Sequence, residues 1–188
     1  MLDTSFRPRA TLRLLPSLGA SVALAGVATL ALGAQPTLIP AVALAAVAPQ
    51  LVAIDLAEHR LPNRLVVPAL TAGVVGLAVG WVAGGDPPIV PALAAAVGGG
   101  VFLVLAVFGG VGMGDAKLVA ALGLASPTVG VAILSPLLAF TLGGVAAVVV
   151  MIRRGRHAHL AFGPFLLGGY FGALALGALT VAVTRIGR

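Results

Sequence analysis

Long apolar runs, separated by short polar segments, dominate the chain. The runs cover about residues 14–33, 38–55, 64–84, 89–108, 116–125, 128–152 and 160–183. Most of them approach or exceed the ~20 apolar residues that a helix needs to cross a bilayer. The pattern predicts an all-α fold, a polytopic transmembrane helical bundle that forms a single domain over residues 1–188. Residues 1–37 would supply an N-terminal arm and the first span.

The stretch from residue 116 to residue 152 admits two interpretations. It holds either two crossings, the first of them short, or one long span preceded by a partly inserted loop. With two crossings, nine of the eleven basic residues fall on the side of the N-terminus, and only Arg185 and Arg188 fall on the other. Because basic loops are retained in the cytoplasm, we expect seven spans rather than six. The N-terminus would be cytoplasmic, and the chain would lie in the inner (cytoplasmic) membrane as a multi-pass protein.

The first apolar run has a second interpretation, a signal peptide. It follows Arg7, Arg9 and Arg13 and ends on small residues near Ala34, as signal peptides do. Because the run approaches the length of a full span, we expect a transmembrane helix instead.

Composition agrees with a membrane protein whose partner is the lipid bilayer. Only 9% of the residues are charged, and the mean hydropathy is +1.17. The net charge of +6 raises the question of nucleic acid, but aromatic residues for base stacking make up only 5%. The chain has no cysteine, and His157 and His159 lack the spacing of metal ligands. We therefore expect no nucleic acid, no metal and no cofactor.

Local signals give further expectations. Asn63 is expected to cap the third span, and Pro164 to lie in the first turn of the last helix, where its missing N–H has no partner. The glycines at 98–100 are expected to let neighbouring helices pack closely.

Two polar clusters interrupt the apolar pattern. One, at residues 109–118, contains Asp115 and Lys117 after several glycines, and the other, at residues 55–63, begins with Asp55. Two spans lie between the aspartates, one leading out and one leading back, so both carboxylates should reach the same membrane face. Ionisable residues at such a boundary indicate a functional site.

Two carboxyl groups in a partly dry site share a proton, because both cannot ionise cheaply. Such a dyad can activate water for attack on an amide while the protonated member binds the carbonyl oxygen. Lys117 would either tune this dyad or extend to the interface as a snorkelling side chain. The same aspartates also suit a proton- or cation-coupled transporter, and a membrane assembly subunit without chemistry is a third hypothesis.

Three motifs occur in order along the chain. Residues 112–118 contain a Gly-x-Gly-Asp sequence ending at Asp115, Asp55 is followed by Leu-Pro-Asn at 61–63, and Phe-Gly-Pro-Phe-Leu occupies 162–166. Together they resemble the motifs of the type IV prepilin peptidases, aspartic membrane proteases that cleave the leader peptides of pilins. The resemblance covers roughly residues 50–170.

The resemblance implies that Asp55 and Asp115 are the catalytic pair and that the substrate is a pilin-like precursor with a cytoplasmic basic leader. Residues expected to shape the site or bind substrate are Gly112, Gly114, Lys117, Glu58, Gly163 and Pro164. Larger members of the family carry paired cysteines in a cytosolic region and also methylate the pilin. This chain has none, which makes N-methyltransferase activity doubtful. The short form is similar to tight-adherence pilus peptidases, and archaeal preflagellin peptidases share the two aspartates, so the precursor and the oligomeric state stay open.

Overall fold

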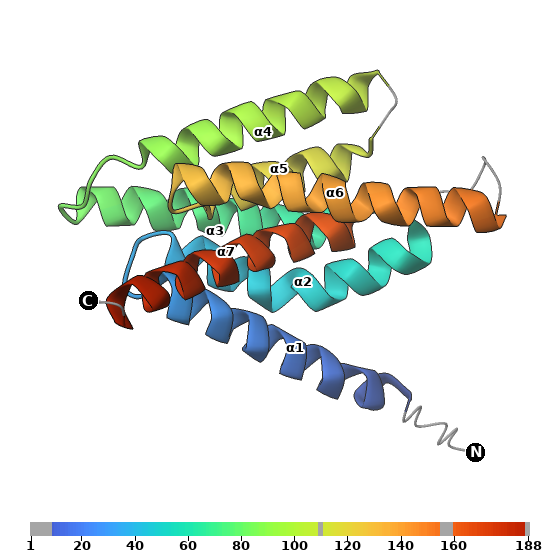
Figure 1. Cartoon of the computed structure of the whole chain (residues 1–188), viewed down its shortest axis with the longest axis horizontal. Helices are drawn as coiled ribbons and strands as arrows, with labels where there is room; N and C mark the ends of the chain where they lie inside the picture. The colour runs from blue at the N-terminus through green and yellow to red at the C-terminus, as the bar shows by residue number, and fades with distance from the viewer. Residues whose placement is uncertain (1–8, 109–110, 155–159, 187–188) are drawn as a thin grey trace, which may run out of the picture.

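A computed structural model of the chain describes residues 9–108, 111–154 and 160–186, which form seven α-helices and no strand (Figure 1). The helices are α1 (Arg9–Leu32), α2 (Leu38–Glu58), α3 (Asn63–Val82), α4 (Ile89–Val107), α5 (Met113–Leu124), α6 (Val129–Arg154) and α7 (Gly163–Ile186). Each corresponds to one of the apolar runs in the sequence. The predicted all-α bundle is confirmed.

Five helices, α2, α3, α4, α6 and α7, are long and apolar enough to cross a membrane. The apolar part of α1 that is described, Ser17–Leu32, is shorter. Helix α5 has 12 residues, which at about 1.5 Å per residue is well short of the ~30 Å hydrocarbon layer. The stretch between residues 116 and 152 contains two helices, of which only α6 is long enough to cross, so the count of seven spans stays a prediction.

Glycines bring α4 and α5 unusually close together. A Cβ on Gly99 would lie 2.9 Å from the Cβ of Ala120, and one on Gly123 would overlap the backbone of Ala95. The close packing expected for residues 98–100 is confirmed for Gly98 and Gly99, whereas Gly100 faces open space. Small residues here replace the side-chain layer that normally separates two helices.

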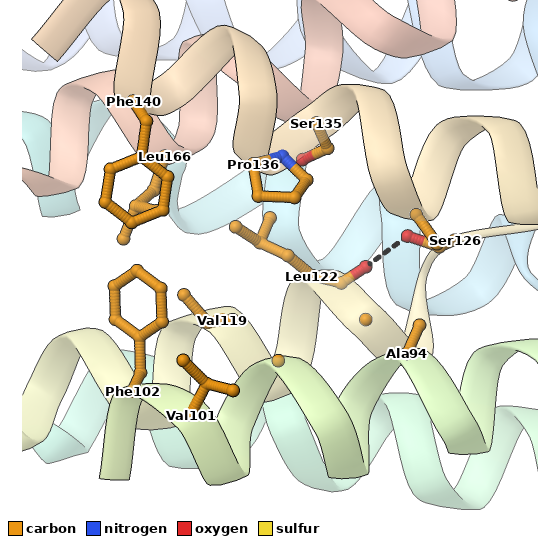
Figure 2. Close-up of a pocket in the computed structure, with 13 residues that line it drawn as sticks. Ala94, Val101, Phe102, Val119, Leu122, Ser126, Ser135, Pro136, Phe140 and Leu166 are labelled. Atoms are coloured by element: carbon orange, nitrogen blue, oxygen red, sulfur yellow. Dashed lines mark hydrogen bonds between the residues drawn. The ribbon is translucent and has the colours of Figure 1, made fainter. Parts of the chain in front are cut away.

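Beside this contact, the packing between α4 and α6 is loose. A cavity of about 180 Å³ lies between α4, α5, α6 and α7 (Figure 2). Its lining is almost entirely apolar and includes Phe102 from α4, Phe140 from α6 and Leu166 from α7. The rings of Phe102 and Phe140 also contact that of Phe162, with centroids 6.3 and 5.4 Å away. This aromatic cluster links the cavity to the beginning of α7.

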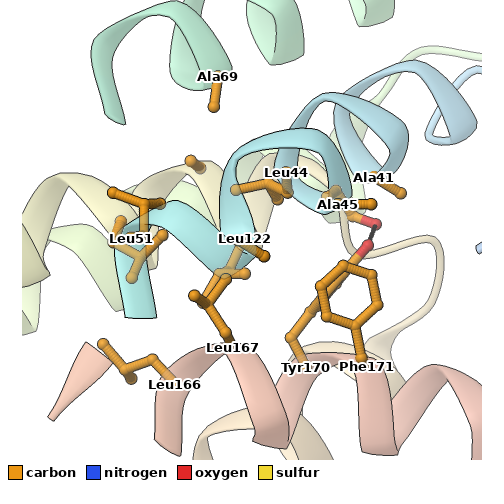
Figure 3. Packing of buried hydrophobic residues seen from close by; sticks show 14 of the residues in the cluster. Ala41, Leu44, Ala45, Leu51, Ala69, Leu122, Leu166, Leu167, Tyr170 and Phe171 are labelled. Atoms are coloured by element: carbon orange, nitrogen blue, oxygen red, sulfur yellow. Dashed lines mark hydrogen bonds between the residues drawn. The ribbon is translucent and has the colours of Figure 1, made fainter. Parts of the chain in front are cut away.

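The core lies where α2, α5 and α7 meet (Figure 3). Leu44 and Leu51 of α2, Leu118 of α5 and Tyr170 of α7 are fully buried in it. The Tyr170 hydroxyl donates a hydrogen bond of 2.8 Å to the carbonyl of Ala125, the residue that follows α5. The short helix α5 is therefore surrounded by α2, α3, α4 and α7, with its far end attached to α7.

Four helix ends gather at one end of the bundle. The C-terminus of α2 and the N-termini of α3, α5 and α7 lie toward the same side in Figure 1. Hydrogen bonds link α7 to α2 and α5 to α3 there. The chain thus returns to this end after each pair of helices, and Asp55 and Asp115 both lie at it.

Candidate active site

Asp55 lies in the last turn of α2 and is almost completely buried, with 4% of its surface exposed. Its Oδ2 accepts a hydrogen bond of 2.8 Å from the backbone N–H of Gly163, 108 residues further along the chain. Gly163 is the first residue of α7, so this N–H has no partner within its own helix. The partial positive charge of a helix N-terminus favours a carboxylate at this position. Asp55 is therefore held in place by the N-terminus of α7.

The close approach of α7 to Asp55 requires glycine. A Cβ on Gly163 would lie 2.8 Å from Asp55 Oδ2 and 3.2 Å from Cδ2 of Leu61. Any larger residue would displace either the Asp55 carboxylate or the N-terminus of α7. Pro164 follows in the first turn of α7, as expected, where it removes no helical hydrogen bond.

Asp115 lies in the first turn of α5 and is half-buried. Its Oδ2 accepts a hydrogen bond of 3.2 Å from the backbone N–H of Gly112, the residue before the helix. Helix α5 is not among the five helices able to span a membrane. Burial first, and then the negative charge of Asp55, raise the pKa of Asp115 from 3.8 to about 6, while the Gly112 N–H opposes this rise. The two carboxyl groups thus lie close enough to influence each other's protonation.

Leu61 connects the two aspartates by packing. It lies in the loop between α2 and α3 and is 9% exposed. A Cβ on Gly114 would lie 2.8 Å from the Cβ of Leu61, and the Leu61 side chain also reaches Gly163. One leucine therefore contacts the residue before Asp115 and the residue that binds Asp55.

Lys117 lies one turn after the beginning of α5, and its Nζ donates a hydrogen bond of 2.9 Å to Oδ1 of Asn63. The expectation that Asn63 caps α3 is wrong. Pro62 occupies the cap position without a side-chain cap bond, and Asn63 is the first helical residue. The Asn63 side chain points to α5 because Lys117 offers it a charged donor there.

Glu58 does not join the aspartates. Its carboxylate forms an ion pair with Arg60, and both side chains are largely exposed. The chain turns directly after Glu58, since His59 adopts a left-handed conformation with φ of 50°. Within the described residues no group of three or more His, Cys, Asp or Glu is placed to hold a metal ion, and His157 and His159 lie outside those residues.

Sequence reasoning missed two features of this site. Leu61 was treated only as part of a loop motif, and Asn63 only as a helix cap. The signal available was their position, since both stand in the Leu-Pro-Asn motif that follows Asp55. The partners of Leu61, however, are two glycines that lie far away in the sequence. No pattern in the sequence indicates that they contact Leu61.

Comparison with protein families gives one finding that bears on this arrangement. The model of the type IV leader peptidase family matches residues 42–152, which include both aspartates. The match confirms the family inferred from the motifs and covers two of the three, whereas the motif at residues 162–166 lies outside the matched range. Comparison with curated proteins and with solved structures gave no match.

Proposed function

Because the chain belongs to the type IV leader peptidase family, we propose that it is a membrane-embedded aspartic endopeptidase with Asp55 and Asp115 as its catalytic dyad. The observation that carries the proposal is the meeting of these residues. They are 60 positions apart in sequence, yet Leu61 packs both on Gly114, the residue before Asp115, and on Gly163, the hydrogen-bond donor to Asp55. Placing two acidic groups side by side in a membrane protein costs free energy. A catalytic role explains why the fold brings them together.

The geometry suits a pair that shares one proton. Each carboxylate has its Oδ2 held by a backbone N–H, from Gly163 for Asp55 and from Gly112 for Asp115. These hydrogen bonds from the backbone fix the orientation of each carboxyl group. A backbone N–H carries no net charge, so it forms no ion pair with the carboxyl group. The Oδ1 atoms remain for a water molecule and a substrate carbonyl. Because coupled carboxyls titrate as a pair, the base and acid roles belong to the dyad as a whole.

Hydrolysis by this dyad would proceed in two steps. The ionised carboxyl takes a proton from water as the water oxygen attacks the carbonyl carbon, while the protonated carboxyl donates its proton to the carbonyl oxygen. In the second step the tetrahedral intermediate returns a hydroxyl proton to one carboxylate, and the other transfers its proton to the leaving nitrogen as the C–N bond breaks. The dyad ends with one proton, as it began. No further group is required.

We infer that the substrate is a pilin-like precursor cleaved after its leader at the cytoplasmic face of the inner membrane. The family supports a leader peptide as the part removed. The excess of basic residues on the side of the N-terminus supports a cytoplasmic position for Asp55 and Asp115. A precursor with a basic leader would therefore present it at the membrane face where the dyad lies.

The test is co-expression of the chain with a candidate pilin precursor, followed by a gel-mobility assay. Wild type should remove the leader, and Asp55→Asn and Asp115→Asn should each abolish removal, because both changes preserve shape and eliminate ionisation. Asp86→Asn is the matched control, since Asp86 is an exposed acid in the turn between α3 and α4. Processing by either dyad variant, present at the wild-type membrane level, would contradict the proposal. Proton flux in liposomes that depends on the aspartates, without processing, would favour the transporter instead.

A further inference from the structure

We propose that Asn63 and Lys117 are a positioning pair, whose hydrogen bond holds the loop between α2 and α3 against α5 and thereby sets the separation of the two aspartates. The inference rests on the proposed function, because it concerns how that dyad is held. Neither residue would touch the substrate. We call the hydrogen bond between their side chains the α3–α5 latch.

The latch completes a continuous chain of covalent and hydrogen bonds between the two aspartates. The chain leaves Asp55 at the end of α2, turns at His59, where the His59 N–H bonds the Asp55 carbonyl at 2.8 Å, and reaches Asn63 at the beginning of α3. From Asn63 the latch crosses to Lys117, two residues after Asp115. The two carboxylates are thus joined by a short continuous path that contains one side-chain hydrogen bond. Breaking that bond opens the path.

Leu61 lies inside this path and contacts both sides of the dyad. A Cβ on Gly114 would lie 3.0 Å from the Leu61 carbonyl oxygen and 2.8 Å from its Cβ, and the Leu61 side chain also packs on Gly163. The residue is therefore wedged between the N-termini of α5 and α7. Its position depends on the loop, and the latch holds the loop on the α5 side.

The hydrogen bond of Lys117 goes to an amide and not to a carboxylate. Within the described part of the chain the one ion pair joins Arg60 and Glu58, so the Lys117 ammonium forms none with Asp55 or Asp115. Its hydrogen-bond partner is the neutral amide oxygen of Asn63, on an exposed surface. A lysine that neutralised the dyad would bond a carboxylate instead of reaching across to another helix. The contact assigns Lys117 to the support of the site.

The latch can be tested by a double-mutant cycle on the purified enzyme in liposomes, with a precursor that wild type cleaves. Asn63→Leu and Lys117→Met each remove one partner with little change of volume, and both should lower kcat roughly tenfold with KM within about twofold. The double variant should lose no more than either single variant, because both remove the same bond. Asn63→Asp keeps the acceptor and should retain wild-type kcat.

Three results would overturn the proposal. They are wild-type kcat in Asn63→Leu, a loss in the double variant equal to the product of the single losses, and a change confined to KM. The last would indicate that Lys117 binds substrate. Failure of the dyad itself is recognised separately, because Asp55→Asn and Asp115→Asn would then still cleave the precursor.

A second measurement needs no catalysis. Because the chain has no cysteine, Leu61→Cys introduces a single thiol at the wedge, and Arg60→Cys introduces one at an exposed neighbouring position. Adding Lys117→Met or Asn63→Leu should speed maleimide labelling of the cysteine at 61 at least fivefold and leave labelling at 60 unchanged. Equal labelling of position 61 with and without the latch would show that the latch does not hold the loop.

Discussion

Two regions separated by one turn of α7 are packed in opposite ways. At Gly163 the backbone of α7 touches the Asp55 carboxylate and Leu61 so closely that one added carbon has no room. Three residues later, Leu166 lines a cavity of about 180 Å³. The site end is held by backbone donors and glycine contacts, whereas the cavity is bounded mainly by apolar side chains.

The contrast indicates where the chain tolerates change. Around the dyad, each distance depends on a backbone position, so a substitution moves a catalytic group. On the α6 side of the cavity, a new side chain can occupy empty space without displacing a neighbouring helix. A matched series of substitutions can establish whether this difference in packing governs activity and stability.

The largest effect is expected from Gly163→Ala. The new Cβ would meet Asp55 Oδ2 at 2.8 Å and Leu61 at 3.2 Å, so either the Asp55 carboxylate or the N-terminus of α7 must move, and the hydrogen bond between them is disturbed. A displacement approaching 1 Å at a catalytic group costs about 100-fold in rate. We expect a loss of that order in precursor cleavage, measured as the rate per folded enzyme in liposomes.

Gly168→Ala is the control for this change. Gly168 lies on the same helix, and a Cβ there meets nothing within 4 Å. It should cleave at the wild-type rate, and its helix should gain a few tenths of a kcal/mol. If Gly163→Ala folds and also cleaves at the wild-type rate, the site end is not as tightly constrained as its contacts indicate.

Gly123→Ala is expected to have the next largest effect, on stability. Its Cβ would overlap the backbone of Ala95, and neither helix can yield without separating α4 from α5. Overpacking of this kind destabilises by about 3 kcal/mol, seen as a lower midpoint of thermal unfolding in detergent. Gly100→Ala, on α4 but facing open space, should keep or slightly raise the midpoint. A midpoint for Gly123→Ala equal to that of wild type would contradict close packing between α4 and α5.

Asp115→Asn should abolish cleavage and yet stabilise the fold. Because the pKa of Asp115 rises from 3.8 to about 6 on folding, the folded state holds this proton more tightly than the unfolded chain, and stability falls as the pH rises from about 4 to about 6. Asparagine does not ionise, so the Asp115→Asn variant does not lose this stability as the pH rises. With allowance for partial exposure, the gain should be about 1–2 kcal/mol above pH 6.

Thermal unfolding of both proteins at pH 4.5 and pH 7.5 measures this difference. The midpoint of Asp115→Asn should exceed that of wild type at pH 7.5, and the excess should shrink at pH 4.5. An excess that is the same at both pH values would mean that ionisation of Asp115 is not its cause. Wild-type cleavage should also decline above about pH 6, as the dyad loses its shared proton.

Much of this arrangement follows from the order of apolar and polar segments. Seven apolar runs became seven helices, and the two helices between Asp55 and Asp115 return the chain to the same end. That conclusion needs only the direction of successive helices. It requires no knowledge of which side chains touch.

The contacts that complete the site were beyond sequence reasoning for a physical reason. The donor to Asp55 is a backbone N–H. Every residue except proline carries such a group, so the residue type at position 163 does not indicate the hydrogen bond. The place of Leu61 depends on two glycines, Gly114 and Gly163, which act by what they lack. Asn63 has a good reason to cap a helix, and only the tertiary approach of Lys117 gives it a stronger partner.

The smallest effect is expected at the cavity, from Ala132→Leu. Ala132 lines it from α6, and the added carbons can enter the empty volume without displacing α7. Filling an apolar cavity commonly stabilises by about 0.5–2 kcal/mol, and we expect the lower part of that range with cleavage unchanged. Ala147→Leu, on an exposed part of the same helix, should leave the unfolding midpoint nearly unaltered. A marked loss of cleavage in Ala132→Leu alone would mean that the cavity side is coupled to the dyad through the phenylalanine cluster, and the contrast between the two regions would fail.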